Sequence, residues 1–104
     1  MPRFSCGVQE KRITRRFVIR NKSGLHARPA AQFVRTASSF KGTRVTVTAV
    51  FSGRSADARS IVQVLAMGAS PGQEIEVAAD GPEAQKCIDA VAELIEKTLP
   101  ATDV

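Results

Sequence analysis

The chain has 104 residues, of which 43% are apolar and 24% charged, and these values fit one soluble globular domain. No stretch approaches the roughly 20 apolar residues needed to cross a bilayer. The first residues also lack the apolar core of a signal peptide, so we expect a cytoplasmic protein with no direct membrane insertion. Two cysteines, Cys6 and Cys87, are too few for a disulfide framework.

The net charge of +5 is unevenly distributed along the chain. Residues 1–60 contain 13 Lys or Arg and 2 Asp or Glu, whereas residues 61–104 contain 2 and 8. A basic half favours an anionic partner. Nucleic acid is a poor candidate for that partner, because the chain lacks Trp, Tyr and any recognisable nucleic-acid-binding motif. We therefore expect acidic protein surfaces and no nucleic acid.

The first predicted elements are a strand and a helix. Residues 1–11 are polar and irregular and are expected to form a flexible N-terminal extension. Residues 13–19 alternate as a half-buried strand, and residues 21–24 break it. The helix that follows carries Pro29 in its first turn, where a missing N–H costs least, and Lys41-Gly42 ends it. Its apolar positions follow helical spacing: Ala30, Phe33, Val34 and Ala37.

A hairpin and a short helix are predicted next. Residues 43–51 alternate with period two, which places Val45, Val47, Ala49 and Phe51 on one face. Ser52-Gly53 is a hairpin signal, and residues 54–58 return as a third strand. The apolar run 60–67 is predicted to be a two-turn helix, because Ser60 is a good N-cap and Gly68 a good C-terminal stop.

The last elements are a strand over residues 74–79 and a long helix. Pro82 is expected at the first helical position with Glu83 beside it, and Pro100 marks the stop. The apolar stripe of this helix includes Cys87, for which we expect a reduced, packed thiol. The other members of the stripe are Ala84, Ile88, Val91, Leu94, Ile95 and Leu99.

The predicted order, β-α-β-β-α-β-α, indicates an α+β domain over residues 12–100 with a C-terminal tail at 101–104. The middle strands form a hairpin, so the sheet is at least partly antiparallel. The helices can cover one face and leave a two-layer sandwich. The other face would carry polar side chains suited to solvent: Thr14, Arg16, Arg44, Thr46 and Thr48.

His26 is the only histidine and the strongest candidate for chemistry. A neutral imidazole is a good nucleophile near pH 7, and a helix N-terminus favours an anion. Ser23 and Gly24 form a turn that can expose the ring, and Pro29 removes an N–H that a capping side chain would bond. Arg28 supplies donors matched to phosphate. We therefore expect a phosphoryl group to be held briefly on this imidazole.

Other kinds of site are not supported. One histidine and two distant cysteines match no usual zinc spacing, and no serine nucleophile elbow is present. The chain also lacks a glycine-rich nucleotide loop, so a partner would have to supply the phosphate, and no cofactor is expected.

Ser60 is a second candidate. Its simplest role is that of an ordinary N-cap. A phosphate there would suit the helix dipole and add about −2 charge beside an apolar surface, so that it could switch partner binding without unfolding the domain. Ile61, Val62 and Leu65 would form that surface, the alternative being that all three lie in the core.

The segment Gly24-Leu25-His26-Ala27-Arg28-Pro29-Ala30, with Arg59-Ser60-Ile61 further on, resembles the HPr family of the phosphoenolpyruvate-dependent sugar phosphotransferase system. The resemblance covers about residues 12–99. It implies an open-faced β-sandwich whose four-stranded antiparallel sheet is covered on one face by three helices.

The resemblance also implies roles for residues and partners. His26 would accept phosphate on Nδ1 from enzyme I and pass it to IIA domains of sugar permeases. Arg28 would assist the phosphohistidine, and Ser23, Gly24 and Pro29 would shape the site. Ser60 matches the serine that an HPr kinase/phosphorylase modifies. The chain would act as a stoichiometric carrier rather than an enzyme, most simply as a monomer.

Two departures from the family pattern leave the acceptor open. The N-terminal extension is longer than usual, and the hairpin around residues 50–54 is slightly longer. Residues 21–29 and 75–82 also look like the nitrogen-related branch of the family. A rival interpretation is a regulatory binding module, in which Ser60 phosphorylation governs docking to a transcription regulator and His26 is secondary.

Overall fold

The computed structural model describes residues 11–22 and 24–102, and within them the predicted order of elements is confirmed. The last long helix continues as a π-helical turn and then as a short final helix. The elements are β1 (Lys11–Val18), α1 (Ala27–Ser38), β2 (Arg44–Ala49), β3 (Ser55–Asp57), α2 (Ile61–Met67), β4 (Glu74–Gly81), α3 (Ala84–Glu93), η1 (Leu94–Thr98) and α4 (Leu99–Thr102).

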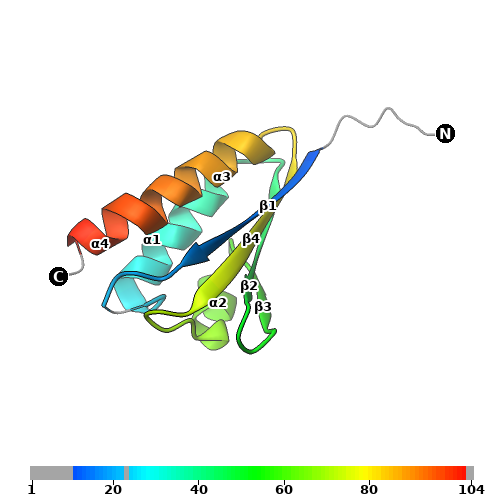
Figure 1. Cartoon of the computed structure of the whole chain (residues 1–104). Helices are drawn as coiled ribbons and strands as arrows, with labels where there is room; N and C mark the ends of the chain where they lie inside the picture. Colours follow the sequence, from blue (N-terminus) through cyan, green and yellow to red (C-terminus); the bar gives the residue numbers. More distant parts are fainter. Residues whose placement is uncertain (1–10, 23, 103–104) are drawn as a thin grey trace.

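The four strands form one antiparallel sheet in the order β1-β4-β2-β3. The central strand β4 pairs with β1 on one side, where Phe17 lies opposite Ile75, and with β2 on the other, where Val47 lies opposite Val77. Helices α1 and α3 run along one side of the sheet, and α2 lies beside β2 and β3 (Figure 1). The fold is therefore the open-faced two-layer α+β sandwich that the sequence predicts.

The core lies between the sheet and the helices. Side chains that alternate along the strands meet the apolar stripes of α1 and α3, and Phe33 is fully buried at this boundary. Burial of a side chain of that size contributes about 2–3 kcal/mol. The predicted stripe of α3, including Cys87, is buried throughout. The opposite face of the sheet carries Thr14, Arg16, Arg44, Thr46 and Thr48, all of them half-buried or exposed as predicted.

Phe51 does not join the apolar face of β2, so this prediction is wrong. The strand ends at Ala49, and the N–H of Gly53 bonds to the carbonyl oxygen of Ala49 at 2.8 Å. This turn carries Phe51 out of the sheet, where 85% of its surface is exposed. The alternation of the sequence continued past the point at which the backbone turns.

Both ends of the last helix differ from expectation. Strand β4 extends to Gly81, so Pro82 precedes the helix rather than opening it, and Glu83 is the N-cap. Pro100 does not stop the helix. It is the second residue of α4, directly after the π-helical turn η1, and turns of this kind accompany local interruptions of the helical hydrogen-bond ladder. Strand β1 begins at Lys11 and α4 reaches Thr102, slightly beyond the domain bounds expected from sequence.

Within the described ranges, no helix has the length and apolar character needed to cross a membrane. Cys6 and Ser23 lie outside the described residues, as do the extension before Lys11 and residues 103–104 of the expected tail.

Candidate functional site

His26 occupies the N-cap of α1, at the end of the loop that leaves β1. Its backbone is extended, with φ −126° and ψ 156°, and its side chain makes no capping hydrogen bond. The residue is exposed. The imidazole is therefore placed beside the helix N-terminus without being used to satisfy it.

The first turn of α1 is distorted next to the histidine. Ala27 has a φ of +45°, which is uncommon for a residue with a side chain and costs roughly 1–2 kcal/mol. Ala30 makes a long hydrogen bond of 3.4 Å from its N–H to the carbonyl oxygen of His26, and Pro29 has no N–H to donate. Strain of this kind persists only where the surrounding structure fixes it, and it concentrates at functional sites.

Arg28 lies in the same helical turn as His26, as predicted. It is exposed, and it takes part in none of the ion pairs formed among the described residues. The first turn of α1 contains no acidic side chain. The guanidinium group is thus available to an anion held at His26, and it adds positive charge to that of the helix N-terminus.

The loop before His26 is fixed by contacts with the segment between α2 and β4. The N–H of Leu25 donates to the carbonyl oxygen of Ala69 at 3.0 Å. Gly24 has a φ of +63°, and a Cβ atom on it would lie 2.5 Å from that same oxygen. Only glycine fits here, for reasons of both conformation and space. Gly24 thus allows the close packing of the loop that leads to His26.

Asn21 also shapes this loop, although sequence reasoning did not select it. It is 1% exposed, and its side-chain amide donates to the carbonyl oxygen of Gly24 at 2.8 Å. The N–H of Gly24 returns a bond to the carbonyl oxygen of Asn21 at 3.2 Å. An asparagine a few residues before a glycine is an ordinary turn signal, so nothing in the sequence pattern distinguishes a buried role from an exposed one.

Ser60 caps α2, which confirms the predicted position. Its hydroxyl accepts a hydrogen bond from the N–H of Gln63 at 3.3 Å. The side-chain oxygen of Gln63 in turn accepts from the N–H of Asp57, at the edge of β3, at 2.9 Å. The start of α2 is therefore tied to the sheet edge through one glutamine.

The exposed face of α2 is apolar. The exposed fractions are 37% for Ile61, 72% for Val62 and 38% for Leu65, whereas Val64 and Met67 are buried in the core. The alternative that all three predicted surface residues lie in the core is excluded. Helices α1 and α2 pack against each other, so the helix that carries this surface lies next to the helix that begins at His26.

No group of three or more His, Cys, Asp or Glu side chains within residues 11–22 and 24–102 is arranged to hold a metal ion. The chemistry available at His26 is that of an imidazole, a guanidinium group and the N–H groups of a helix start.

The chain matches the family model described as the PTS HPr component phosphorylation site over residues 13–97. It is 36% identical to the phosphocarrier protein HPr of Chlamydia muridarum, over 84% of this chain and 81% of that protein. It is 34% identical to the multiphosphoryl transfer protein of Salmonella typhimurium, over 80% of this chain but only 22% of that longer protein.

Solved structures of the same kind are also similar. HPr-C-His of Thermoanaerobacter tengcongensis superposes with a TM-score of 0.76 at 37% identity, covering 86% of this chain and 94% of that one. The HPr of Bacillus anthracis superposes with a TM-score of 0.75 at 27% identity, covering 81% of this chain and 96% of that one.

Proposed function

The chain belongs to the HPr family of phosphocarrier proteins of the phosphotransferase system, and we propose that His26 is the residue on which it carries the phosphoryl group. The observation that supports this assignment most directly is the exposed imidazole at the N-cap of α1, which makes no capping bond. Because the chain has one histidine, a phosphohistidine in this protein has no other position to occupy.

In the proposed reaction, Nδ1 of the neutral imidazole attacks phosphorus, and the bond between phosphorus and the donor breaks with its electron pair leaving on the donor. The second transfer reverses these roles, and His26 becomes the leaving group. Arg28 and the helix N-terminus stabilise the phosphoryl oxygens as negative charge gathers on them. No small molecule is turned over, so the protein acts as a stoichiometric carrier and not as an enzyme.

The proposed partners are enzyme I, as donor, and IIA domains, as acceptors. We also propose that the protein is a cytoplasmic monomer. The apolar residues Ile61, Val62 and Leu65 form a surface beside α1 for successive docking of the two. The basic first half of the chain suits acidic partner surfaces and speeds encounter, an effect that salt weakens. The nitrogen-related branch, with a different acceptor, uses the same donor chemistry.

The test is incubation with phosphoenolpyruvate labelled with ³²P and a purified bacterial enzyme I. We expect label that is stable in base and lost in acid, as for a phosphoramidate, and none in His26→Ala. Arg35→Gln, which removes an exposed positive charge from the far end of α1, is the matched control and is expected to label normally. Acid-labile label in His26→Ala would refute the assignment.

A second candidate function is regulation through Ser60. The hydroxyl lies at the N-cap of α2, where the helix dipole tolerates a phosphate, and Ile61 and Val62 beside it are exposed. We propose that an HPr kinase/phosphorylase modifies Ser60 and thereby changes which partner docks on α2. Incubation with ATP and such a kinase should give acid-stable phosphate that is lost in Ser60→Ala but kept in Ser55→Ala, which removes an exposed hydroxyl from β3.

A further inference from the structure

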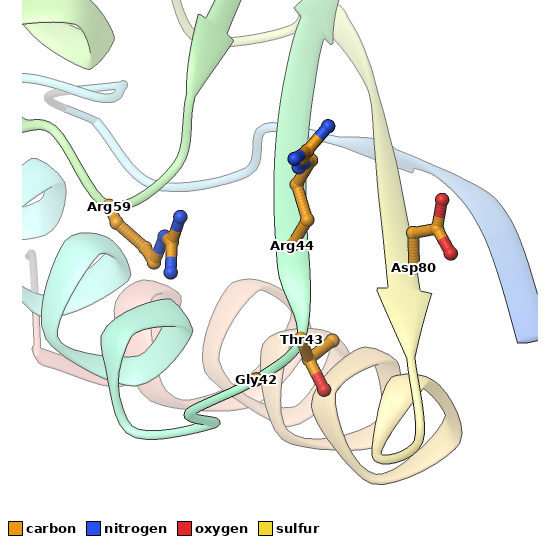
Figure 2. Close-up of a pocket in the computed structure, with 5 residues that line it drawn as sticks. All are labelled: Gly42, Thr43, Arg44, Arg59 and Asp80. Atoms are coloured by element: carbon orange, nitrogen blue, oxygen red, sulfur yellow. The ribbon is translucent and has the colours of Figure 1, made fainter. Parts of the chain in front are cut away.

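A cavity of about 350 Å³ opens at the end of the sheet remote from His26. It is lined by Gly42, Thr43, Arg44, Arg59 and Asp80, which come from the start of β2, the turn before α2 and the end of β4 (Figure 2). The loop to His26 leaves the opposite end of the sheet, where Val18 pairs with Glu74. Six residues of β4 separate the two ends, which corresponds to roughly 20 Å.

Arg44 faces this cavity without a carboxylate partner. Asp80 lies directly opposite it in the register of β2 and β4, yet neither residue takes part in an ion pair among the described residues. The carboxylate of Asp80 points away from Arg44 (Figure 2). The cavity therefore presents a guanidinium group and a carboxylate at separate positions.

Arg59 supplies a second guanidinium group from the other wall. Its ion pair with Asp57 is 3.6 Å long and nearly half exposed on both sides, so it is worth little and exchanges readily for a better anion. The backbone that carries Arg59 is fixed, because the N–H of the preceding Ala58 donates to Val45 at 3.0 Å. Two guanidinium groups from different elements thus flank one cavity (Figure 2).

The backbone beside the cavity is closely packed. A Cβ atom on Gly81 would lie 2.8 Å from the carbonyl oxygen of Gly42 and from Cα of Thr43, so β4 and the start of β2 are in close contact. The hydroxyl of Thr43, which is buried, also accepts a hydrogen bond from the N–H of Glu83 at 3.2 Å. The backbone at this end of the cavity is therefore held in place, and the exposed side chains of Arg44 and Arg59 extend from it.

We propose that this cavity is a second ligand site, independent of the phosphoryl transfer at His26, and that it binds a small phosphorylated sugar or polyol. Two guanidinium groups match the oxygens of a phosphate monoester. The carboxylate of Asp80 repels an anion but accepts hydrogen bonds from hydroxyl groups, so it selects a ligand with hydroxyls beyond the phosphate. The volume of about 350 Å³, at the low end of the range for ligand sites, suits a ligand of a few carbons.

The test is an NMR titration of the full chain, labelled with ¹⁵N, with ribose 5-phosphate, ribose and inorganic phosphate. Amide shifts are expected around Gly42, Arg44 and Asp80 with ribose 5-phosphate, and none with ribose at equal concentration. Arg44→Gln and Arg59→Gln should each weaken binding about tenfold, the value of one charge-assisted contact. Arg35→Gln, an equal charge change on exposed α1, should weaken it less than about twofold.

Asp80→Asn separates attraction for phosphate from selection of the sugar. This variant should bind inorganic phosphate more tightly and lose the advantage of ribose 5-phosphate over inorganic phosphate. Three results would overturn the proposal: equal weakening in Arg35→Gln, shifts centred on His26, or tighter binding of a single-stranded oligonucleotide than of ribose 5-phosphate. The titration contains neither phosphoenolpyruvate nor enzyme I, so its outcome is independent of the phosphocarrier assignment.

Discussion

The N–H of Leu25 donates to the carbonyl oxygen of Ala69, so the residue before His26 is held by a segment more than forty positions further along the chain. The same oxygen lies 2.5 Å from the position that a Cβ atom on Gly24 would take. The position of the imidazole thus depends on the packing of one loop against another.

Gly24→Ala is expected to lower the free energy of unfolding by about 2–4 kcal/mol, because it adds both a steric clash and a strained φ. Gly53→Ala is the matched control, since Gly53 also has a positive φ, of +77°, but a Cβ there meets nothing within 4 Å. Gly53→Ala should cost only about 1 kcal/mol, because it introduces the strained φ without the steric clash. Urea denaturation measures both. Equal losses in the two variants would show that the contact with Ala69 contributes nothing.

Arg28→Gln is expected to slow phosphoryl transfer through His26 at least about tenfold, because one charge-assisted contact to the phosphoryl oxygens is lost. Stability should change by less than about 0.5 kcal/mol, since the side chain is exposed and makes no ion pair with a described residue. Rapid-quench measurement of label transfer from enzyme I gives the rate. Arg28→Lys keeps the charge but not the fork of donors, so its transfer rate should lie between those of the parent protein and Arg28→Gln. An unchanged rate in Arg28→Gln would show that Arg28 does not act at the site.

Ser60→Ala is expected to destabilise the protein by about 1 kcal/mol, because the N–H of Gln63 loses its capping acceptor. Ser60→Asp keeps an acceptor and adds a favourable charge at the helix start, so its stability should stay close to that of the parent protein. Thermal unfolding monitored by circular dichroism compares the three. If the Asp variant loses as much as the Ala variant, the hydroxyl does more than cap α2.

Burial, with a smaller contribution from the negative charge of Glu83, raises the pKa of the Cys87 thiol from its ordinary value of 9.0 to about 11. The unfolded chain releases this proton near pH 9 while the folded protein keeps it, so stability is complete below pH 9 and falls as pH rises from 9 towards 11. The slope should be up to about 1.4 kcal/mol per pH unit.

The measurement is the urea midpoint at pH 8 and pH 10 in a Cys6→Ser background, with Cys87→Ala as the comparison. Cys87→Ala is expected to be less stable at both pH values, but its urea midpoint should fall less between pH 8 and pH 10. A fall that is identical with and without Cys87 would assign the alkaline loss to other groups. In the same background, Ellman's reagent at pH 8 should label Cys87 only after unfolding, because the thiol is fully buried.

Sequence periodicity predicted most of the fold because its signals are local. The spacing of Ala30, Phe33 and Ala37 alone identifies the buried face of α1. Alternation cannot show where a strand turns, which is why Phe51 was misplaced. Nor could any local pattern show that Gly24 lies against Ala69, since that contact depends on how two distant loops pack.

In the candidate sites, too, the sequence predicts which residues are close within one helix but not which distant elements meet. His26, Arg28 and Pro29 lie in one helical turn, so their proximity follows from sequence spacing. The cavity lined by Arg44, Arg59 and Asp80 joins elements that the pairing of β2 with β3 and β4 brings together, and no spacing in the sequence indicates it.

The bond from Asp57 to Gln63 has a consequence for the behaviour of the protein at high concentration. An unpaired sheet edge offers free N–H groups to a second chain and invites aggregation. Strand β3 has only three residues, and Gln63 occupies the N–H of Asp57. The other edge strand, β1, carries Arg12, Arg15 and Arg16, whose charges oppose edge-to-edge pairing. Both edges of the described sheet thus carry features that oppose pairing with a second chain.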